Sequence, residues 1–272
     1  MRHTSVGTAL VATILMSGTV AGDAAPRARF ASEKNAPTVD VELILAVDVS
    51  HSMTVEELAI QREGYAHAIR SDEFIRALQS GPNGRISIAY FEWSGPKDQR
   101  IIVPWSLVDG PEAAGVVASQ ILSIPVERGT QTSISGAIRF AMPLFDRDPY
   151  TGTRRVIDIS GDGANNSGPP VLQIRHEALA KGLIINGLPM MMNEFTMTMD
   201  VEHLDWYYED CIIGGSGSFM VPINSRDKLK ESILIKLVRE ISDRTADRPV
   251  NAVSNQAPRV NCAINEKIFD DR

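Results

Sequence analysis

The stretch Val39–Met53 has the sequence VDVELILAVDVSHSM and decides the fold. Its central run, Leu43–Val47, is apolar without alternation, which is typical of a strand buried on both faces in a parallel sheet. Asp48, Ser50 and Ser52 then alternate along an extended turn, where their oxygens can converge past the carboxyl end of the strand. Such hard oxygen donors suit a divalent cation like Mg²⁺. Alternatively, these side chains satisfy the turn and cap the following helix.

Length and composition suit one large domain with flanking segments. The chain has 272 residues, of which 43% are hydrophobic, and this is enough to enclose a sizeable core. The formal net charge is −7 at pH 7. An acidic chain has no broad electrostatic attraction to nucleic acid or anionic lipid. We therefore expect no nucleic-acid partner.

The first residues are predicted to direct export and not to join the fold. Arg2 precedes the apolar run Val6–Val20, and small residues follow that run, as in a cleaved signal. We therefore assign residues 1–25 to a secretory signal peptide and residues 26–38 to a mobile leader. A retained membrane anchor is less favoured because the run is short of a full span. The mature protein is expected to be periplasmic or extracellular, with no membrane span.

Strand patterns and helix patterns alternate from residue 39 to residue 242. The predicted strands are 43–47, 85–93, 100–107, 154–160, 183–188 and 218–223. The predicted helices are 55–69, 72–79, 111–122, 134–145, 171–181, 201–209 and 226–241. This alternation predicts a doubly wound α/β fold with a mostly parallel central sheet and helices on both faces. Pro104 makes the third strand an antiparallel edge strand, since proline cannot donate to a ladder. Residues 243–272 form a polar tail.

Oxygen-bearing side chains also occur in two later loops. Gly129-Thr130-Gln131-Thr132 precedes a predicted helix, and Gly161-Asp162-Gly163 ends a predicted strand. Together with Asp-x-Ser-x-Ser at Asp48–Ser52, and in this order, these motifs resemble the von Willebrand factor type A domain. The resemblance covers about residues 39–242 and implies a Rossmann-like fold with a metal-ion-dependent adhesion site. Chain order and length are also similar to a bacterial branch of uncharacterised secreted proteins with this domain, which implies no activity.

The resemblance assigns metal ligands by position. They are Asp48, Ser50, Ser52, Thr130 and Asp162, the last often acting through water in this family. Thr132 is the alternative to Thr130, although Thr130 directly follows a glycine as in the family pattern. The sequence departs from that pattern in the third loop, which continues through the uncharged Asn165 and Asn166. It also departs at 190–199, which looks like an insertion.

These features predict an exported domain that binds Mg²⁺, or Mn²⁺ or Ca²⁺, and through the ion a protein partner. An acidic side chain of the partner would complete the coordination of the cation. One alternative is a metal-dependent hydrolase in which Asp48 and Asp162 hold the ion while His51 or Asp158 moves protons. Another is a structural domain whose metal only stabilises the fold. Because the sequence shows no nucleophile and no poised acid–base pair, we expect no catalytic residues and no enzyme.

Two features outside the loops have structural interpretations. Asp158 lies in mid-strand among apolar neighbours, where an unpaired charge is costly. We expect it to pair with Arg154 or Arg155, and we favour this over a catalytic role. Five methionines fall within 190–199. We expect a loop that folds onto the sheet edge, rather than a Cu(I) site, because no Cys or His lies beside them.

The chain has two cysteines, Cys211 and Cys262. In an oxidising compartment they would form one disulfide, whereas in the cytosol they would be two buried thiols. With an export signal predicted, we expect the disulfide, which would tie the tail back to the sheet.

Overall fold

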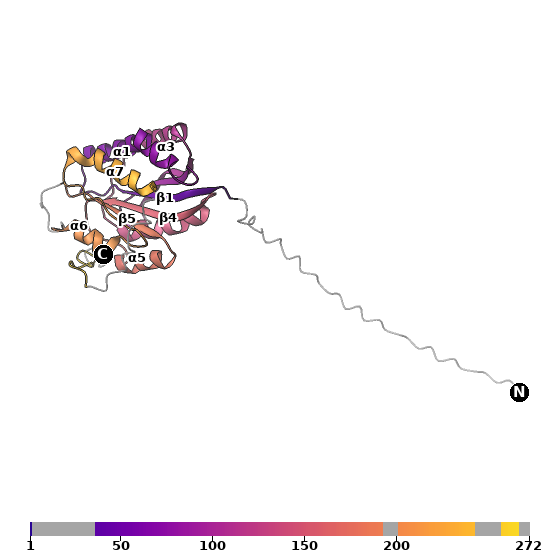
Figure 1. The fold of residues 1–272 in the computed structure, drawn as a ribbon. Coiled ribbons are helices and arrows are strands. Elements are labelled where there is room, and N and C mark those ends of the chain that lie inside the picture. Colours follow the sequence, from indigo (N-terminus) through magenta and orange to yellow (C-terminus); the bar gives the residue numbers. More distant parts are fainter. Residues whose placement is uncertain (2–35, 193–200, 243–256, 267–272) are drawn as a thin grey trace. The chain divides into compact units, whose positions relative to one another are not determined.

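The computed structural model describes Met1 and residues 36–192, 201–242 and 257–266. Within these residues, five strands form one sheet in the order β3-β2-β1-β4-β5 (Figure 1). The strands are β1 (Thr38–Asp48), β2 (Ile86–Trp93), β3 (Gln99–Val108), β4 (Thr151–Gly161) and β5 (Ile184–Pro189). The predicted signal peptide, most of the leader and parts of the methionine segment and of the tail lie outside the described residues.

The pairing of the strands confirms the predicted sheet. β1 pairs in parallel with β2 and β4, and β4 pairs in parallel with β5, whereas β3 runs antiparallel to β2. Pro104 lies in β3 at the edge of the sheet, where its missing N–H interrupts no central ladder. β1 is central, and every residue from Val39 to Asp48 is buried. Burial on both faces explains why this strand shows no alternation.

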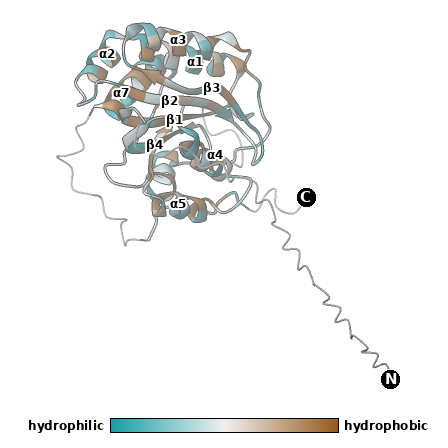
Figure 2. Ribbon diagram, turned by 90° about the vertical axis from the view of Figure 1, so that its right-hand side faces the viewer, coloured by the Kyte–Doolittle hydropathy of each residue, from teal (hydrophilic) through white to brown (hydrophobic). Residues whose placement is uncertain are grey.

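Helices cover both faces of the sheet (Figure 1 and Figure 2). The layer on one face consists of α1 (Val55–Arg70), α2 (Asp72–Gln79), α3 (Pro111–Ser123) and α7 (Leu229–Ile241). The layer on the other face consists of α4 (Ile134–Ala141), α5 (Val171–Ala180) and α6 (Leu204–Tyr207). Each layer packs its apolar side chains onto its own face of the sheet, so the domain has two cores.

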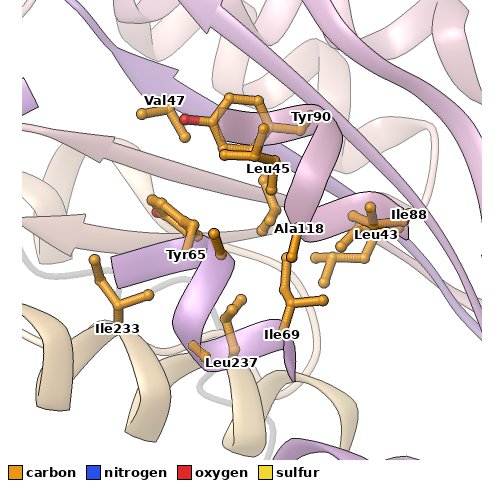
Figure 3. Close-up of a cluster of buried hydrophobic side chains, with 14 of the residues drawn as sticks. Leu43, Leu45, Val47, Tyr65, Ile69, Ile88, Tyr90, Ala118, Ile233 and Leu237 are labelled. Carbon is orange, nitrogen blue, oxygen red and sulfur yellow. The ribbon is translucent and has the colours of Figure 1, made fainter. Parts of the chain in front are cut away.

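β1 supplies side chains to both cores. Figure 3 shows the core beneath α1 and α7, with the labelled side chains Leu43, Leu45 and Val47 of β1, Tyr65 and Ile69 of α1, and Ile233 and Leu237 of α7. The intervening residues Ile44 and Ala46 belong to the core on the other face. Successive side chains of a strand point to opposite faces. The central strand therefore fixes the helices of both layers.

The starts and ends of several helices follow local sequence signals. Thr54 caps α1, and its hydroxyl and the Glu57 carboxylate form the predicted capping box. The predicted helix 134–145 is shorter than expected, because α4 ends at Ala141 and a 3₁₀ turn, Met142–Arg147, follows. Pro143 lies at the start of that turn and has no N–H to continue the α-helical ladder.

The predicted strand 218–223 is wrong. This segment pairs with the sheet through isolated bridges, of Met220 to Gly187 and of Ile223 to Met190. The Val221 N–H donates to the Gly187 carbonyl at 3.1 Å, and the Ile223 N–H donates to the Pro189 carbonyl at 2.9 Å. The segment therefore lies beside β5, but it does not form a continuous strand there.

Asp158 has the structural pairing that we predicted, but with a different partner. Its Oδ1 lies 2.7 Å from Nζ of Lys236 on α7, and both side chains are buried. Arg155 instead pairs with Glu42, and Arg154 donates a hydrogen bond to the Glu240 carbonyl. Arg155 lies on the face of β4 opposite to Asp158, whereas Arg154 shares its face but is four residues away, roughly 13 Å along a strand. The helix packed on that face supplies the counter-ion instead.

Cys211 and Cys262 form a disulfide, as predicted. Both are buried in the core beneath α4, α5 and α6, so residues 257–266 are tied to this side of the sheet. Among the helices that the structure describes, none has the length and apolar character to cross a membrane.

Candidate metal centre

The sheet topology brings the first and third predicted loops together. Asp48 ends β1, and Gly161 ends β4, its parallel neighbour, with Val47 paired to Ser160. The two strands therefore release their loops at the same edge. A Cβ atom on Gly161 would lie 2.9 Å from Asp48 Oδ2, so only glycine allows the carboxylate this position.

Four of the five predicted ligands are connected through a chain of hydrogen bonds. The Ser50 N–H donates to Asp48 Oδ1 at 2.7 Å. The hydroxyls of Ser50 and Ser52 are 3.0 Å apart, and the Ser52 hydroxyl donates to Asp162 Oδ1 at 2.6 Å. Asp48 and Ser50 are buried, whereas Ser52 is exposed and Asp162 is partly exposed. The site therefore has a closed inner side and an open outer side.

The second loop reaches the site through its backbone. The Gly129 N–H donates to the Val49 carbonyl at 2.8 Å, which places Thr130 next to the first loop. Thr130 is exposed, and its hydroxyl forms no hydrogen bond to the other four candidates, all of which the structure describes. Thr132 is buried and faces the third loop, since a Cβ atom on Gly163 would lie 3.9 Å from its Oγ1. Both threonines therefore stay candidates for the hydroxyl ligand.

Asp48 lacks a compensating charge among the described residues. Its Oδ2 atom is buried and has no hydrogen-bond partner there. Burial raises the pKa of Asp48 well above its usual range, and the negative charge of Asp162 raises it further, against hydrogen bonds from the backbones of Ser50 and Asp162. A buried carboxylate that faces a second carboxylate is costly to ionise. A cation between them would supply the missing charge.

The chemistry of the donors fits a hard divalent cation. Two carboxylates and several hydroxyls are ligands of the kind that Mg²⁺ or Ca²⁺ prefers. Within the described residues, no group of three or more His, Cys, Asp or Glu side chains could hold a metal. Besides the two carboxylates, any cation at this site therefore depends on Ser and Thr hydroxyls and on water. Because these ligands are neutral, the bound cation would remain electrophilic.

Tyr208 is a residue at this site that the sequence did not reveal. The predicted helix 201–209 is only α6, and a π turn, Tyr208–Ile212, follows it. The Tyr208 hydroxyl donates to the Gly161 carbonyl at 3.4 Å, and a Cβ atom on Gly187 would lie 2.6 Å from its ring. Burial, and then the charges of Asp48 and Asp162, raise the pKa of Tyr208 well above its usual range. The neutral phenol closes the inner side of the site.

Glycines in two neighbouring strands, at the end of β4 and inside β5, could have signalled this tyrosine. Gly161 and Gly187 leave room on one face of the sheet, and glycine in a strand often marks the close approach of another group. The pattern does not say which group approaches. The segment that supplies Tyr208 also belongs to a π turn, a rare element that often occurs at functional sites.

Of the two residues that the hydrolase alternative required for proton transfer, one lies far inside the core. Asp158 is ion-paired with Lys236 between the sheet and α7. His51 is exposed on the first loop, and the Arg128 guanidinium donates to its carbonyl. Arg128 thus adds a positive charge to the outer rim of the site.

Comparison with solved structures finds the same fold at low sequence identity. Proximal thread matrix protein 1 from the mussel byssus, solved with a zinc-occupied MIDAS motif, has a TM-score of 0.56 at 18% identity over 75% of this chain and 48% of that one. The pilus adhesin SpaC from Lactobacillus rhamnosus GG has a TM-score of 0.55 at 12% identity, over 75% and 30%. A von Willebrand factor type A protein from Catenulispora acidiphila has a TM-score of 0.53 at 14% identity, over 75% and 43%.

These likenesses show the fold and extend to less than half of each of those chains. They agree with the von Willebrand factor type A-like architecture that the motifs implied. A search of curated proteins by sequence found no match. A family model described as "Protein of unknown function (DUF1194)" matches residues 38–245. This match spans most of the chain, which therefore belongs to the DUF1194 family.

Proposed function

We propose that this protein is an exported, divalent-cation-dependent protein-binding domain of the adhesion type. The cation is Mg²⁺, or Mn²⁺ or Ca²⁺, and its proposed ligands are Asp48, Ser50, Ser52, Thr130 and Asp162. The observation that carries the proposal is the buried Oδ2 of Asp48, which has no hydrogen-bond partner in the described part of the chain, beside the hydroxyls that lead to Asp162. When bound, the cation would supply an electrophilic position for an anionic ligand.

The proposed partner presents an acidic side chain to this position. Ser52 and Asp162 reach solvent, so a carboxylate from another protein can approach from the open side. Arg128, on the rim, adds a positive charge there. Complementary charge guides encounter and orientation more than it adds affinity. A metal and Arg128 together would therefore favour an acidic partner locally, although the chain as a whole is acidic.

Two further findings support the proposal. A protein of the same fold, proximal thread matrix protein 1, has a zinc-occupied MIDAS motif, and another, SpaC, is a pilus adhesin. The disulfide between Cys211 and Cys262 suits an oxidising compartment, in line with the export signal expected at residues 1–25. We propose binding and not catalysis because, of the two residues considered for proton transfer, Asp158 is ion-paired in the core and only His51 lies at the site.

The proposal predicts that metal binding and partner binding fail together. Asp48→Ala should abolish Mn²⁺ and Mg²⁺ binding measured by calorimetry, since it removes the buried charged donor. It should also abolish metal-dependent binding of an oligoglutamate peptide, measured by surface plasmon resonance with an oligoglutamine peptide as reference. Asp146→Ala, an exposed change of the same type, is the matched control and should leave both unchanged.

A second pair of variants decides between the two threonines. Thr130→Ala should weaken metal binding less than Asp48→Ala does, because it removes a neutral donor, and Thr132→Ala should have the smaller effect. The reverse order would assign the ligand to Thr132. Wild-type protein that binds no divalent cation, or that binds the peptide equally well in EDTA, would contradict the proposed function. Ester or phosphoester hydrolysis that requires Mn²⁺ and Asp48 would instead favour the hydrolase.

A further inference from the structure

The described part of the tail, residues 257–266 (the C-terminal segment), is fixed to the region around α6. The Cys211–Cys262 disulfide holds it covalently. The Arg259 side chain donates to Asp210 at 2.8 and 3.0 Å and to Glu209 at 2.7 Å. Figure 1 draws the segment in yellow near α5 and α6. It lies beyond residues 38–245, the region that the family model covers.

From this position the C-terminal segment contacts the third loop of the candidate metal centre. The Tyr207 hydroxyl donates to the Cys262 carbonyl at 3.4 Å and accepts the Asn165 N–H at 3.2 Å. The Glu266 carboxylate accepts the Val171 N–H at 2.7 Å, and the Asn165 side-chain amide donates to the Pro169 carbonyl at 3.4 Å. Val171 begins α5. The stretch from Asn165 to Val171 is therefore joined to the C-terminal segment at both ends, through the Tyr207 hydroxyl at Asn165 and directly at Val171.

Asn165 and Asn166 extend these contacts to the second loop. Asn165 is fully buried, and its Oδ1 accepts the Ser135 N–H at 3.0 Å. Asn166 exchanges two hydrogen bonds with the Thr132 backbone, at 2.8 and 2.9 Å. These are the asparagines that depart from the family pattern of the third loop. They join the loop of Asp162 to the loop of Thr130 and Thr132.

Buried polar side chains with several partners hold one arrangement, because each lost partner leaves a buried group unsatisfied. Groups of this kind around a metal site set the orientation of its ligands, and their replacement typically lowers metal affinity about 10- to 100-fold. Asn165 belongs to the third loop and is hydrogen-bonded to the first turn of α4 and, through the Tyr207 hydroxyl, to the C-terminal segment. It is therefore placed to transmit the position of the segment to the ligands.

We propose that the C-terminal segment is a brace that positions the second and third loops of the metal centre, with Asn165, Tyr207 and Glu266 as positioning residues. The disulfide is buried, so the brace is permanent and not a redox switch. The inference rests on the proposed metal site. The brace implies that a segment outside the region covered by the family model influences the affinity of the site for its cation.

Mn²⁺ calorimetry on the full chain tests the brace. Tyr207→Phe removes one hydroxyl and both of its hydrogen bonds, and Glu266→Ala removes the carboxylate, so each should raise the Kd about tenfold. Glu266→Gln keeps an acceptor for the Val171 N–H and should stay close to wild type. Tyr90→Phe removes the same atom from the other core and is the matched control.

Hydrogen exchange without metal separates the brace from the metal site. Tyr207→Phe and Glu266→Ala should speed exchange of the Asn165 and Asn166 amides, while amides of β2 and β3 keep the wild-type rate. Unchanged exchange together with unchanged Kd would overturn the brace, even if wild type binds Mn²⁺. If wild type binds no Mn²⁺, the proposed function fails and the link to affinity fails with it, and the exchange rates alone decide whether the segment holds the loops.

Discussion

At the scale of single residues, Asp148 shows how burial without a counter-ion changes a carboxyl group. It follows the 3₁₀ turn after α4, and its Oδ1 accepts the Ser87 hydroxyl and the Tyr150 N–H, both at 3.0 Å. Its Oδ2 is buried without a hydrogen-bond partner among the described residues. Burial raises the pKa of Asp148 from 3.8 to about 6, against the two hydrogen bonds.

We predict that Asp148→Asn stabilises the protein above about pH 7 and has little effect below about pH 4. Because the folded-state pKa of about 6 exceeds the ordinary 3.8, protonated Asp148 favours the fold, and this contribution is lost as the pH rises through 6. Asparagine keeps the Oδ1 acceptor and never ionises. The gain should be about 1–2 kcal/mol, a value reduced for partial exposure.

Urea denaturation at three pH values between about 4 and 8 measures this effect. Asp146→Asn, at an exposed neighbouring residue, should give the wild-type pH profile. Parallel profiles for wild type and Asp148→Asn would show that the Asp148 carboxyl does not titrate differently in the folded chain.

The sequence predicted which candidate ligands lie together better where they share one local motif than where they depend on distant contacts. Asp48, Ser50 and Ser52 lie within one turn, and Asp162 follows the strand paired with β1, so the parallel sheet brings them together. The choice between Thr130 and Thr132 depends on how Asn166 holds the second loop, and no local pattern encodes that contact. Tyr208 was missed for the same reason.

At the scale of elements, α7 is joined to β4 by a buried ion cluster. Lys236 Nζ lies 2.7 Å from Asp158 Oδ1 and 2.6 Å from Glu240 Oε2, and all three side chains are buried. The Phe219 ring centroid lies 4.7 Å from the same Nζ. Burial raises the pKa of Asp158 to about 6, although Lys236 acts to lower it. One cation thus faces two carboxylates.

We predict that Lys236→Met costs about 3–5 kcal/mol of unfolding free energy, because it leaves buried carboxylates without their cation. Adding Asp158→Asn should recover part of the loss, since it removes one of those charges. Lys230→Met is the matched control on the same helix: its ion pair with Glu63 is exposed, so it should cost less than about 1 kcal/mol. Urea denaturation measures all three. Equal costs for Lys236→Met and Lys230→Met would contradict the structural role of the cluster.

Most helices and strands could be predicted from the sequence because their signals are local. The capping box at Thr54 and the uninterrupted run of β1 are examples. Contacts between side chains of different elements were harder to predict from the sequence. We expected Asp158 to pair with Arg154 or Arg155, but its counter-ion is Lys236 on α7, far along the chain. Residues 218–223 have the composition of a strand, yet they pair with β5 through isolated bridges and form no continuous strand.

At the scale of the whole molecule, one end of the sheet concentrates three loops and the C-terminal segment. Two cores and a disulfide stabilise the fold, while at this end the described residues leave the buried Oδ2 of Asp48 without a partner. Sites of function commonly break rules that the rest of a fold obeys. The uncompensated charge at Asp48 should therefore cost stability in the absence of metal.

We predict that Asp48→Asn stabilises the metal-free protein and removes its response to metal. Asp48 is buried and faces the charge of Asp162, whereas asparagine keeps an acceptor for the Ser50 N–H without a charge. The gain should be about 1–3 kcal/mol. Mn²⁺ at about 100 times its Kd should add about 2.7 kcal/mol to wild type and nothing to the variant. Urea denaturation of both proteins, in EDTA and in Mn²⁺, measures the four free energies of unfolding. If the variant is less stable than wild type in EDTA, the Asp48 carboxylate stabilises the fold and the prediction is wrong. If Mn²⁺ stabilises both proteins equally, the cation binds elsewhere.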